Sequence, residues 1–366
     1  MNRPSFLQHH CRYTPVTRAG RSLLGHLARW PVAFGCCVLL LGSLPMVSLA
    51  QERVLEARLV AEAPKVDGVL DDRAWTDAEP MIVAVYQPPF GERPGDTQVE
   101  LRAVRTRDDV YLGIYWKDPT QSIYKEQWTY DGTGWSQDPD TDEDRLALIF
   151  PINDSVPWFS QAGCVLACHA RVGAGSAPTR WYKATLDPAE RLDVWHWKAA
   201  RTNPLGYADD KYWNSDLPAP GRKNAGRHYD WRTPGPDPSS RNRTDDGRAP
   251  RLMQSPQVAP AIPGFLLVEH AVALDMSKLK PGDIVPGRVL AMPGGSRADV
   301  QARALYGDGA WHLEMRRALN TGQDDDAVFQ PGQTIPFALA IFDNVSERRK
   351  QDHGRAMDRL RLRLAE

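Results

Sequence analysis

The sequence predicts an all-β protein, an antiparallel β-sandwich with long irregular loop insertions. Short segments in which apolar and polar residues alternate recur along the chain, separated by turn residues. No long segment has the 3.6-residue apolar period of an amphipathic helix, and there is no evident internal repeat. With 366 residues, of which 42% are hydrophobic and 25% charged, the chain is large enough to bury a sizeable core.

A turn and a loop are expected between the strands of the first half of the sandwich. Asp67-Gly68 predicts a turn, after which Trp75 points toward a core. Residues 117–141 are polar and contain several glycines and prolines, so we expect a loop there. The strands expected in this half are 54–60 as an edge strand, 98–104 and 110–116 as a β-hairpin, 144–151 as a buried strand, and 191–198.

The second half begins with residues 199–261, which are poor in aliphatic side chains and rich in Pro, Gly, Arg and Asp. We expect a long irregular excursion, and loops of that length in a compact domain are usually functional. Strands are then expected at 265–270, 283–290, 300–306, 311–317, 335–342 and 360–364.

Residues 1–50 have the pattern of an export signal, and residues 51–366 form the predicted domain. Three arginines precede a mostly apolar run, and Ser48-Leu49-Ala50 supplies small residues for cleavage after Ala50. We therefore expect a periplasmic protein with no retained membrane span. From Gln51 onward, 40 Lys and Arg face 46 Asp and Glu, a net charge of −6, which argues against nucleic acid as a partner.

The chemical centre of the sequence is Cys164-Val165-Leu166-Ala167-Cys168-His169, a Cys-x-x-x-Cys-His motif. Cys164 and Cys168 are the only cysteines after residue 50. The motif resembles the Cys-x-x-Cys-His site of covalent haem c attachment, with one additional residue between the thiols. The alternatives are a disulfide, free thiols, or part of a metal site. A disulfide here would close a very small loop and constrain the unfolded chain little.

Several segments resemble known families. Residues 66–75 (Val-Asp-Gly-Val-Leu-Asp-Asp-Arg-Ala-Trp) are similar to the opening of family nine carbohydrate-binding modules. Residues 193–198, 206–210 and 311–319, together with the cysteine motif, resemble the ethylbenzene dehydrogenase gamma-subunit-like haem-binding family. The resemblance spans most of the chain from about residue 54. It implies an immunoglobulin-like or carbohydrate-binding-module-like sandwich that holds one haem and passes electrons in the periplasm.

The ligand set cannot be copied from that family. In its better-known members the haem is b-type, with methionine and lysine as axial ligands. Here Ile149 and Phe150 occupy the strand where that methionine is expected, and the cysteine motif is additional. We therefore expect His169 as one iron ligand and His196 as the other. The alternatives for the second position are Lys198, Met292, Met253 and His353.

Other residues are weaker candidates for the site. Alternation places Asp193, Trp195 and Trp197 on one face of their strand and Val194, His196 and Lys198 on the other. Trp195 and Trp197 are candidates to pack a porphyrin, as are Trp158 and Trp181, and an ordinary core is the alternative for each. Arg171, Arg180 and Lys198 are candidates for the propionates. Clustered carboxylates at Asp209-Asp210 and Asp324-Asp325-Asp326 make calcium a further candidate.

No motif of a hydrolase, phosphate-binding loop, dinucleotide fold or zinc protease is recognisable. The sequence thus predicts an electron carrier or electron-transfer subunit, not an enzyme. Its expected partner is another redox protein, such as a molybdenum oxidoreductase or a membrane cytochrome. Two alternatives are a carbohydrate- or ligand-binding sandwich with a Cys164–Cys168 disulfide, and a haem sensor with an open sixth position.

Overall fold

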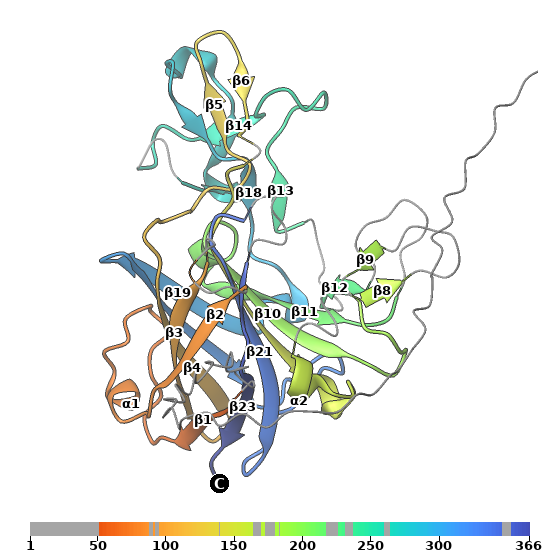
Figure 1. The fold of residues 1–366 in the computed structure, drawn as a ribbon. Helices are drawn as coiled ribbons and strands as arrows, with labels where there is room; N and C mark the ends of the chain where they lie inside the picture. The colour runs from red at the N-terminus through yellow and green to blue at the C-terminus, as the bar shows by residue number, and fades with distance from the viewer. Residues whose placement is uncertain are drawn as a thin grey trace, which may run out of the picture. The chain divides into compact units, whose positions relative to one another are not determined.

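Figure 1 shows a computed structural model of the chain. It describes residues 51–366 apart from 88–90, 92–94, 139, 164–169, 173–179, 183, 217–225, 231–236, 260–263 and 346–352. Residues from Leu49 onward form one compact unit. The expected signal peptide and the cysteine motif lie outside the described residues.

One large sheet of thirteen strands dominates the described chain (Figure 1). Its path runs β1 (Glu52–Leu59), β23 (Arg359–Leu364), β21 (Thr334–Phe342), β22 (Gly354–Ala356), β2 (Met81–Tyr86), β3 (Thr97–Arg105), β4 (Asp109–Lys117), β20 (Ala310–Ala318), β19 (Val300–Gly307), β11 (Tyr207–Trp213), β10 (Leu192–Lys198) and β7 (Arg145–Pro151). The thirteenth strand, β12 (Arg227–Tyr229), pairs with β11. Additional ladders join β21 to β7 and β1 to β3, so the sheet closes on itself around the core. The all-β sandwich prediction is confirmed.

Small sheets and short helices make up the remainder. The small sheets contain β5 (Trp128–Tyr130), β6 (Trp135–Ser136) and β17 (Ile284–Val285); β13 (Ser239–Arg241), β15 (Leu266–Leu267) and β18 (Arg288–Leu290); β14 (Leu252–Gln254) and β16 (Ala271–Ala273); and β8 (Ala170–Val172) and β9 (Arg180–Tyr182). The described α-helices are α1 (Arg73–Thr76) and α2 (Phe159–Ala162), and five 3₁₀ turns accompany them. Among the described residues, no helix has the length and hydropathy of a membrane span.

The main core is formed by the inward-facing residues of the large sheet, as period-two alternation requires. Its aromatic centre is Trp116, Trp197 and Trp311, with ring centroids 5.0–6.3 Å apart. Trp75 on α1 is buried, as expected, but in a separate cluster with Ala78, Val104 and Tyr111; it donates its indole N–H to Glu314 Oε1 at 2.6 Å.

Most of the predicted strands are present. The hairpin is β3–β4, and the strands expected at 144–151, 191–198, 300–306, 311–317, 335–342 and 360–364 are β7, β10, β19, β20, β21 and β23. The strand expected at 54–60 is β1, but it is not an edge strand. It forms parallel ladders with β23 on one side and β3 on the other.

Three regions differ from expectation. Residues 117–141 contain the β5–β6 hairpin. Residues 265–270 contain only the two-residue β15 before a 3₁₀ turn, and 283–290 divides into β17 and β18 of two different sheets. Most importantly, the excursion at 199–261 contains β11, a strand with every residue buried. Its sequence, Tyr-Ala-Asp-Asp-Lys-Tyr-Trp, is polar. Its charged side chains can nevertheless be buried because they are paired inside the protein, as Lys211 is with Asp209.

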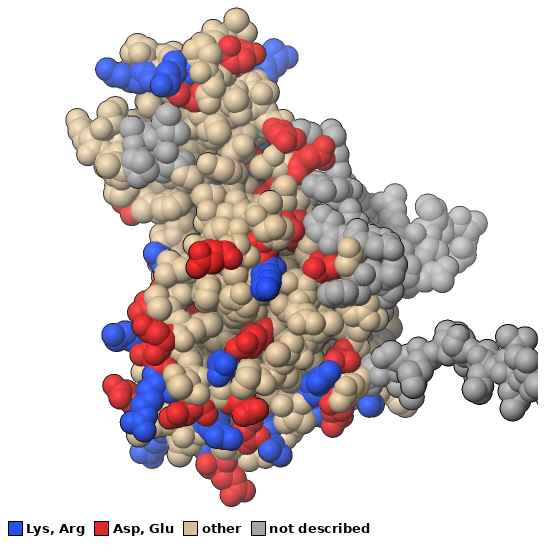
Figure 2. All heavy atoms as spheres, turned by 60° about the vertical axis from the view of Figure 1, so that its left-hand side comes forward, with Lys and Arg blue, Asp and Glu red and all other residues tan. Residues whose placement is uncertain are grey.

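Acidic and basic side chains are interspersed over the lower part of the surface in Figure 2 and do not gather into a patch of one sign. Arg361 with Glu52 and Arg363 with Glu56 are examples of such pairs, across β23 and β1. Exposed pairs of this kind contribute only about 0–1 kcal/mol each. The mixture agrees with the small net charge.

Candidate functional site

The candidate site lies on one face of the four neighbouring strands β21, β7, β10 and β11. Registered pairs place Ala340, Ala147, His196 and Asp209 side by side across these strands. Directly opposed residues in a ladder point to the same side of a sheet. We call this surface the His196 face; its residues are Ala338, Ala340, Phe342, Arg145, Ala147, Ile149, Val194, His196, Lys198, Asp209, Lys211 and Trp213.

The middle of the His196 face is made of small side chains. These are Ala338 and Ala340 on β21 and Ala147 on β7. All three are buried. Because neighbouring strands lie about 4.8 Å apart, the alanines form a shallow floor beside His196.

The residues just before the cysteine motif, in α2 and at Gly163, pack against this floor. Phe159 of α2 packs with Ile149, Val194 and Ala338. Gly163, the residue before Cys164, has φ +55° and ψ −142°, a conformation open essentially only to glycine. A Cβ added at Gly163 would lie 3.6 Å from the Cβ of Ala338. Gly163, the last described residue before the motif, therefore lies against the same sheet face as His196.

Buried positive charge surrounds one carboxylate at the other end of the face. Asp209 pairs with Lys198, with Arg297 at 2.7 Å (Nε to Oδ1) and with Lys211 at 3.6 Å (Nζ to Oδ2). The guanidinium of Arg297 also lies 3.5 Å from the ring centroid of Tyr229. Burial lowers the pKa of both Lys198 and Lys211 well below the usual lysine value, and nearby cations lower it further. Three basic side chains thus surround one carboxylate.

His196 has one ring nitrogen occupied and one free. Nδ1 lies 2.8 Å from Lys211 Nζ. Nε2 is buried and has no hydrogen-bond partner among the described residues. Burial, then repulsion from Lys211, lowers the pKa of His196 well below its usual value, so the imidazole is neutral. A neutral imidazole with a free nitrogen is the form that binds a metal ion.

The opposite face of β10 and β11 belongs to the core. Trp195 and Trp197 are fully buried there, so they lie behind His196 and not beside it. The guanidinium of Arg317 lies 4.8 Å from the Trp195 ring and donates to Asp193 at 2.5 Å. Asp210 and Asp326 lie 3.8 and 3.6 Å from the same guanidinium.

Residues 72–354 match the family model described as ethylbenzene dehydrogenase. The chain belongs to that family. The ethylbenzene dehydrogenase family groups electron-transfer subunits of oxidoreductase complexes that are not themselves catalytic. The resemblance stated from the sequence is therefore confirmed, and no protein of curated function matches the chain.

Two solved structures align with much of the chain. Both are of a family 9 carbohydrate-binding module from Caldicellulosiruptor kristjanssonii, one in complex with glucose and one with cellotriose. Each is 8% identical to this chain and covers 86% of it; 97% and 95% of the modules align, with TM-scores of 0.34 and 0.31. At this level of similarity, the function of these modules is not inferred for this family member.

Several of the residues predicted for the haem site of this ethylbenzene dehydrogenase family member lie outside the described residues. Cys164, Cys168 and His169 lie outside the described residues, as do the side chains of Arg171, Arg180 and Trp181. Lys198 shares the His196 face but is paired with Asp209. Ile149 is on that face and Phe150 in the core.

The alternative ligands are more scattered. His353 is buried and stacks on Phe342, with ring centroids 4.6 Å apart. Met253 is on β14 of a small sheet, where its sulfur accepts the N–H of Asp275. Met292 is exposed, and so is Trp158, at 73%.

The carboxylates considered for calcium do not form one group. Asp209 faces the lysines, whereas Asp210 on the other side of β11 joins Asp193 and Asp326 around Arg317. Asp324 is exposed. Arg317 already supplies a cation to the buried group.

Sequence reasoning missed Lys211, Arg297, Tyr229 and the three alanines of the floor. Lys211 and Tyr229 fall within the region expected to be irregular. Had β11 been recognised, the alternation of Asp209 and Lys211 would have placed both beside His196. The alanines and Arg297 carry no local signal, because their role depends on which strands become neighbours.

Proposed function

We propose that this protein is an exported electron carrier with one covalently attached haem c on the His196 face. Cys164 and Cys168 would form the thioether bonds, His169 would bind the iron from one side, and His196 from the other. The bound haem would supply a one-electron redox centre. The observation that carries the proposal is the unpartnered, buried Nε2 of His196 on the face where the chain enters the cysteine motif.

The remaining residues of the face fit the same group. A flat macrocycle needs a floor without bulky side chains, which Ala147, Ala338 and Ala340 provide. Three basic side chains, those of Lys198, Lys211 and Arg297, surround the one carboxylate of Asp209. Burial and repulsion from nearby cations disfavour the charged forms of the two lysines, and additional negative charge would favour them. The two haem propionates would supply that negative charge.

Two axial histidines would keep the iron six-coordinate and suited to electron transfer. Lys198 is committed to Asp209, which favours His196 over it. The electron-transfer partner would be a periplasmic redox enzyme, with a molybdenum-dependent oxidoreductase or a membrane cytochrome as candidates.

Carbon monoxide binding to the reduced protein tests this assignment. We expect the reduced wild-type protein to bind carbon monoxide slowly or not at all, whereas His196→Ala opens one axial position and binds it rapidly. His312→Ala removes a histidine that packs against Tyr115 on another strand pair and serves as the matched control. An unchanged low-spin spectrum in His196→Ala, with haem present, contradicts the ligand role of His196. Rapid binding by the wild type supports a sensor with an open site instead.

A further inference from the structure

A second group of carboxylates lies at one end of the sandwich core, away from the His196 face. Asp118 follows β4, Asp144 precedes β7, and Asp343 follows β21. Each aspartate is two residues away from a core residue of its strand: Trp116, Leu146 and Ile341, respectively. By alternation, each aspartate therefore lies on the same, inward-facing side as that core residue. Three strands distant in sequence thus place acidic side chains over the end of a hydrophobic core.

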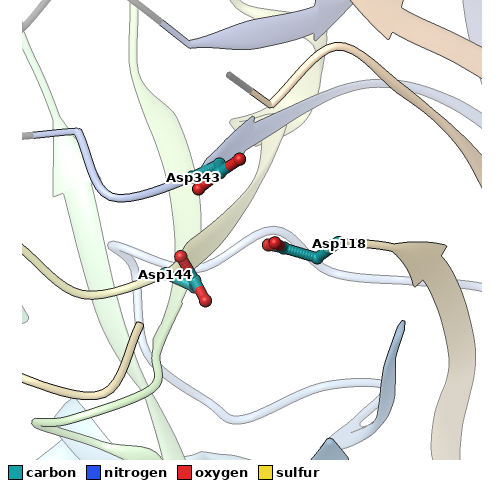
Figure 3. A group of neighbouring side chains, drawn as sticks. All are labelled: Asp118, Asp144 and Asp343. Carbon is teal, nitrogen blue, oxygen red and sulfur yellow. The ribbon is translucent and has the colours of Figure 1, made fainter. Parts of the chain in front are cut away.

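The three carboxylates are close together and shielded from solvent. One oxygen of each lies within 4.8 Å of the others. Asp118 and Asp144 are only 2% and 1% exposed. Figure 3 shows the Asp118 side chain extending toward the gap between Asp144 and Asp343. Oxygens that bind one calcium ion at 2.3–2.6 Å are separated by no more than about 5 Å.

One carboxylate oxygen of the group, on Asp118, has no hydrogen-bond partner among the described residues. Asp118 Oδ1 accepts the N–H of Thr120 at 3.0 Å, which fixes the carboxylate. Asp118 Oδ2 is buried and has no hydrogen-bond partner among the described residues. A buried carboxylate oxygen without a partner costs free energy unless a proton or cation compensates it.

Asp144 is held in place by neutral donors. It accepts the N–H of Ser122 and the indole N–H of Trp311 on Oδ2, and the N–H of Asn344 on Oδ1. No described lysine or arginine lies within 4 Å of the carboxylates of Asp118 or Asp144. The group around Arg317 differs in this respect, because a buried guanidinium pairs with its carboxylates.

We propose that Asp118, Asp144 and Asp343 bind a calcium ion that joins the ends of β4, β7 and β21. Calcium is the cation that suits this donor set, since it prefers oxygen ligands in flexible geometry. Water and backbone carbonyls complete its coordination. The ion secures β7 and β21, the two strands that carry the alanine floor.

Calcium titration of the mature haem-containing protein, after treatment with EDTA and removal of the chelator, tests the proposal. We expect binding of one calcium ion per chain by calorimetry and a rise in the thermal unfolding temperature. Asp118→Asn removes the aimed carboxylate with little change in shape and should weaken binding by more than about tenfold. Asp108→Asn, on an exposed turn, is the matched control and should bind as the wild type does.

If the wild type binds no calcium at millimolar concentration, the proposal is overturned. Protonation, and not a calcium ion, would then neutralise the buried carboxylates. Equal affinity of Asp118→Asn and the wild type overturns it as well. If Asp118→Asn does not fold, Asp343→Asn, at a less buried position, replaces it under the same criteria. The visible spectrum of the haem is not a readout here, so failure of the calcium site and failure of haem attachment remain distinguishable.

Discussion

Gly163 lies against Ala338, with a separation of 3.6 Å between the Cβ of Ala338 and the point where a Gly163 Cβ would be. This contact joins the start of the cysteine motif to the sheet face that carries His196, a residue 33 positions away in the sequence.

Gly163→Ala should destabilise the protein, because its backbone conformation is open essentially only to glycine. We expect a loss of about 1–3 kcal/mol in the free energy of unfolding, measured by denaturant titration. Gly134→Ala is the matched control, because a Cβ there meets nothing within 4 Å. Equal stability of the two variants would show that the chain does not need this conformation before Cys164.

Ala340→Leu should fill part of the alanine floor and lower the haem content of the purified protein. A leucine at this position adds bulk directly beside Ala147 in the same cross-strand row. Overpacking typically costs about 1–3 kcal/mol, so the chain is still expected to fold. Haem per chain is measured by the pyridine haemochrome spectrum, with Ala273→Leu, at an exposed position, as control. Full haem content in Ala340→Leu would place the macrocycle elsewhere.

Arg317→Met should be strongly destabilising, since it leaves Asp193, Asp210 and Asp326 without their buried cation. Removing one partner of a buried ion pair typically costs about 3–5 kcal/mol. Arg361→Met breaks an exposed pair with Glu52 and should cost no more than about 1 kcal/mol. Urea unfolding midpoints compare the two, and similar values would show that protonation already neutralises the buried carboxylates.

The calcium-free protein should lose stability as pH rises. Burial, and then repulsion from Asp343, raises the pKa of Asp118 from 3.8 to about 6; burial, and then repulsion from Asp118, raises that of Asp144 to about 8. The folded state therefore holds protons that the unfolded chain has released. This contribution is fully present below about pH 4 and is lost as pH rises through 6 and 8.

Unfolding in EDTA at pH 5 and pH 8.5 measures this trend. Tyr306, whose hydroxyl donates to the backbone carbonyl of Asp118, stays neutral in that range because burial raises its pKa. Asp230 and Asp326 have pKa values raised to about 9 and about 7, so they contribute in the same direction. The quantity of interest is therefore the difference between wild type and Asp118→Asn, worth up to about 3 kcal/mol. A difference independent of pH would mean that Asp118 does not hold a proton.

Local sequence patterns predicted those strands whose inward rows are apolar. β10 illustrates this, since Trp195 and Trp197 alternate with His196 and its two faces could be assigned before the structure was known. β11 was missed because three of its seven residues are charged, and the burial of those charges depends on partners from other elements. The parallel pairing of β1 on both sides likewise depends on other strands, β3 and the far more distant β23, which is more than 300 residues away.

The candidate site was partly predictable for the same reason. His196 and Lys198 follow from alternation on one strand. Lys211, Arg297 and the alanine floor come from four other elements, and only the fold brings them together.

Covalent haem attachment is tested most directly by the intact mass of the purified mature protein under denaturing conditions. The account predicts one haem mass added to the chain, retained after acid-acetone extraction and absent in a Cys164→Ser, Cys168→Ser double variant. A wild-type mass equal to the polypeptide alone, or lower by two hydrogens as for a disulfide, would contradict it.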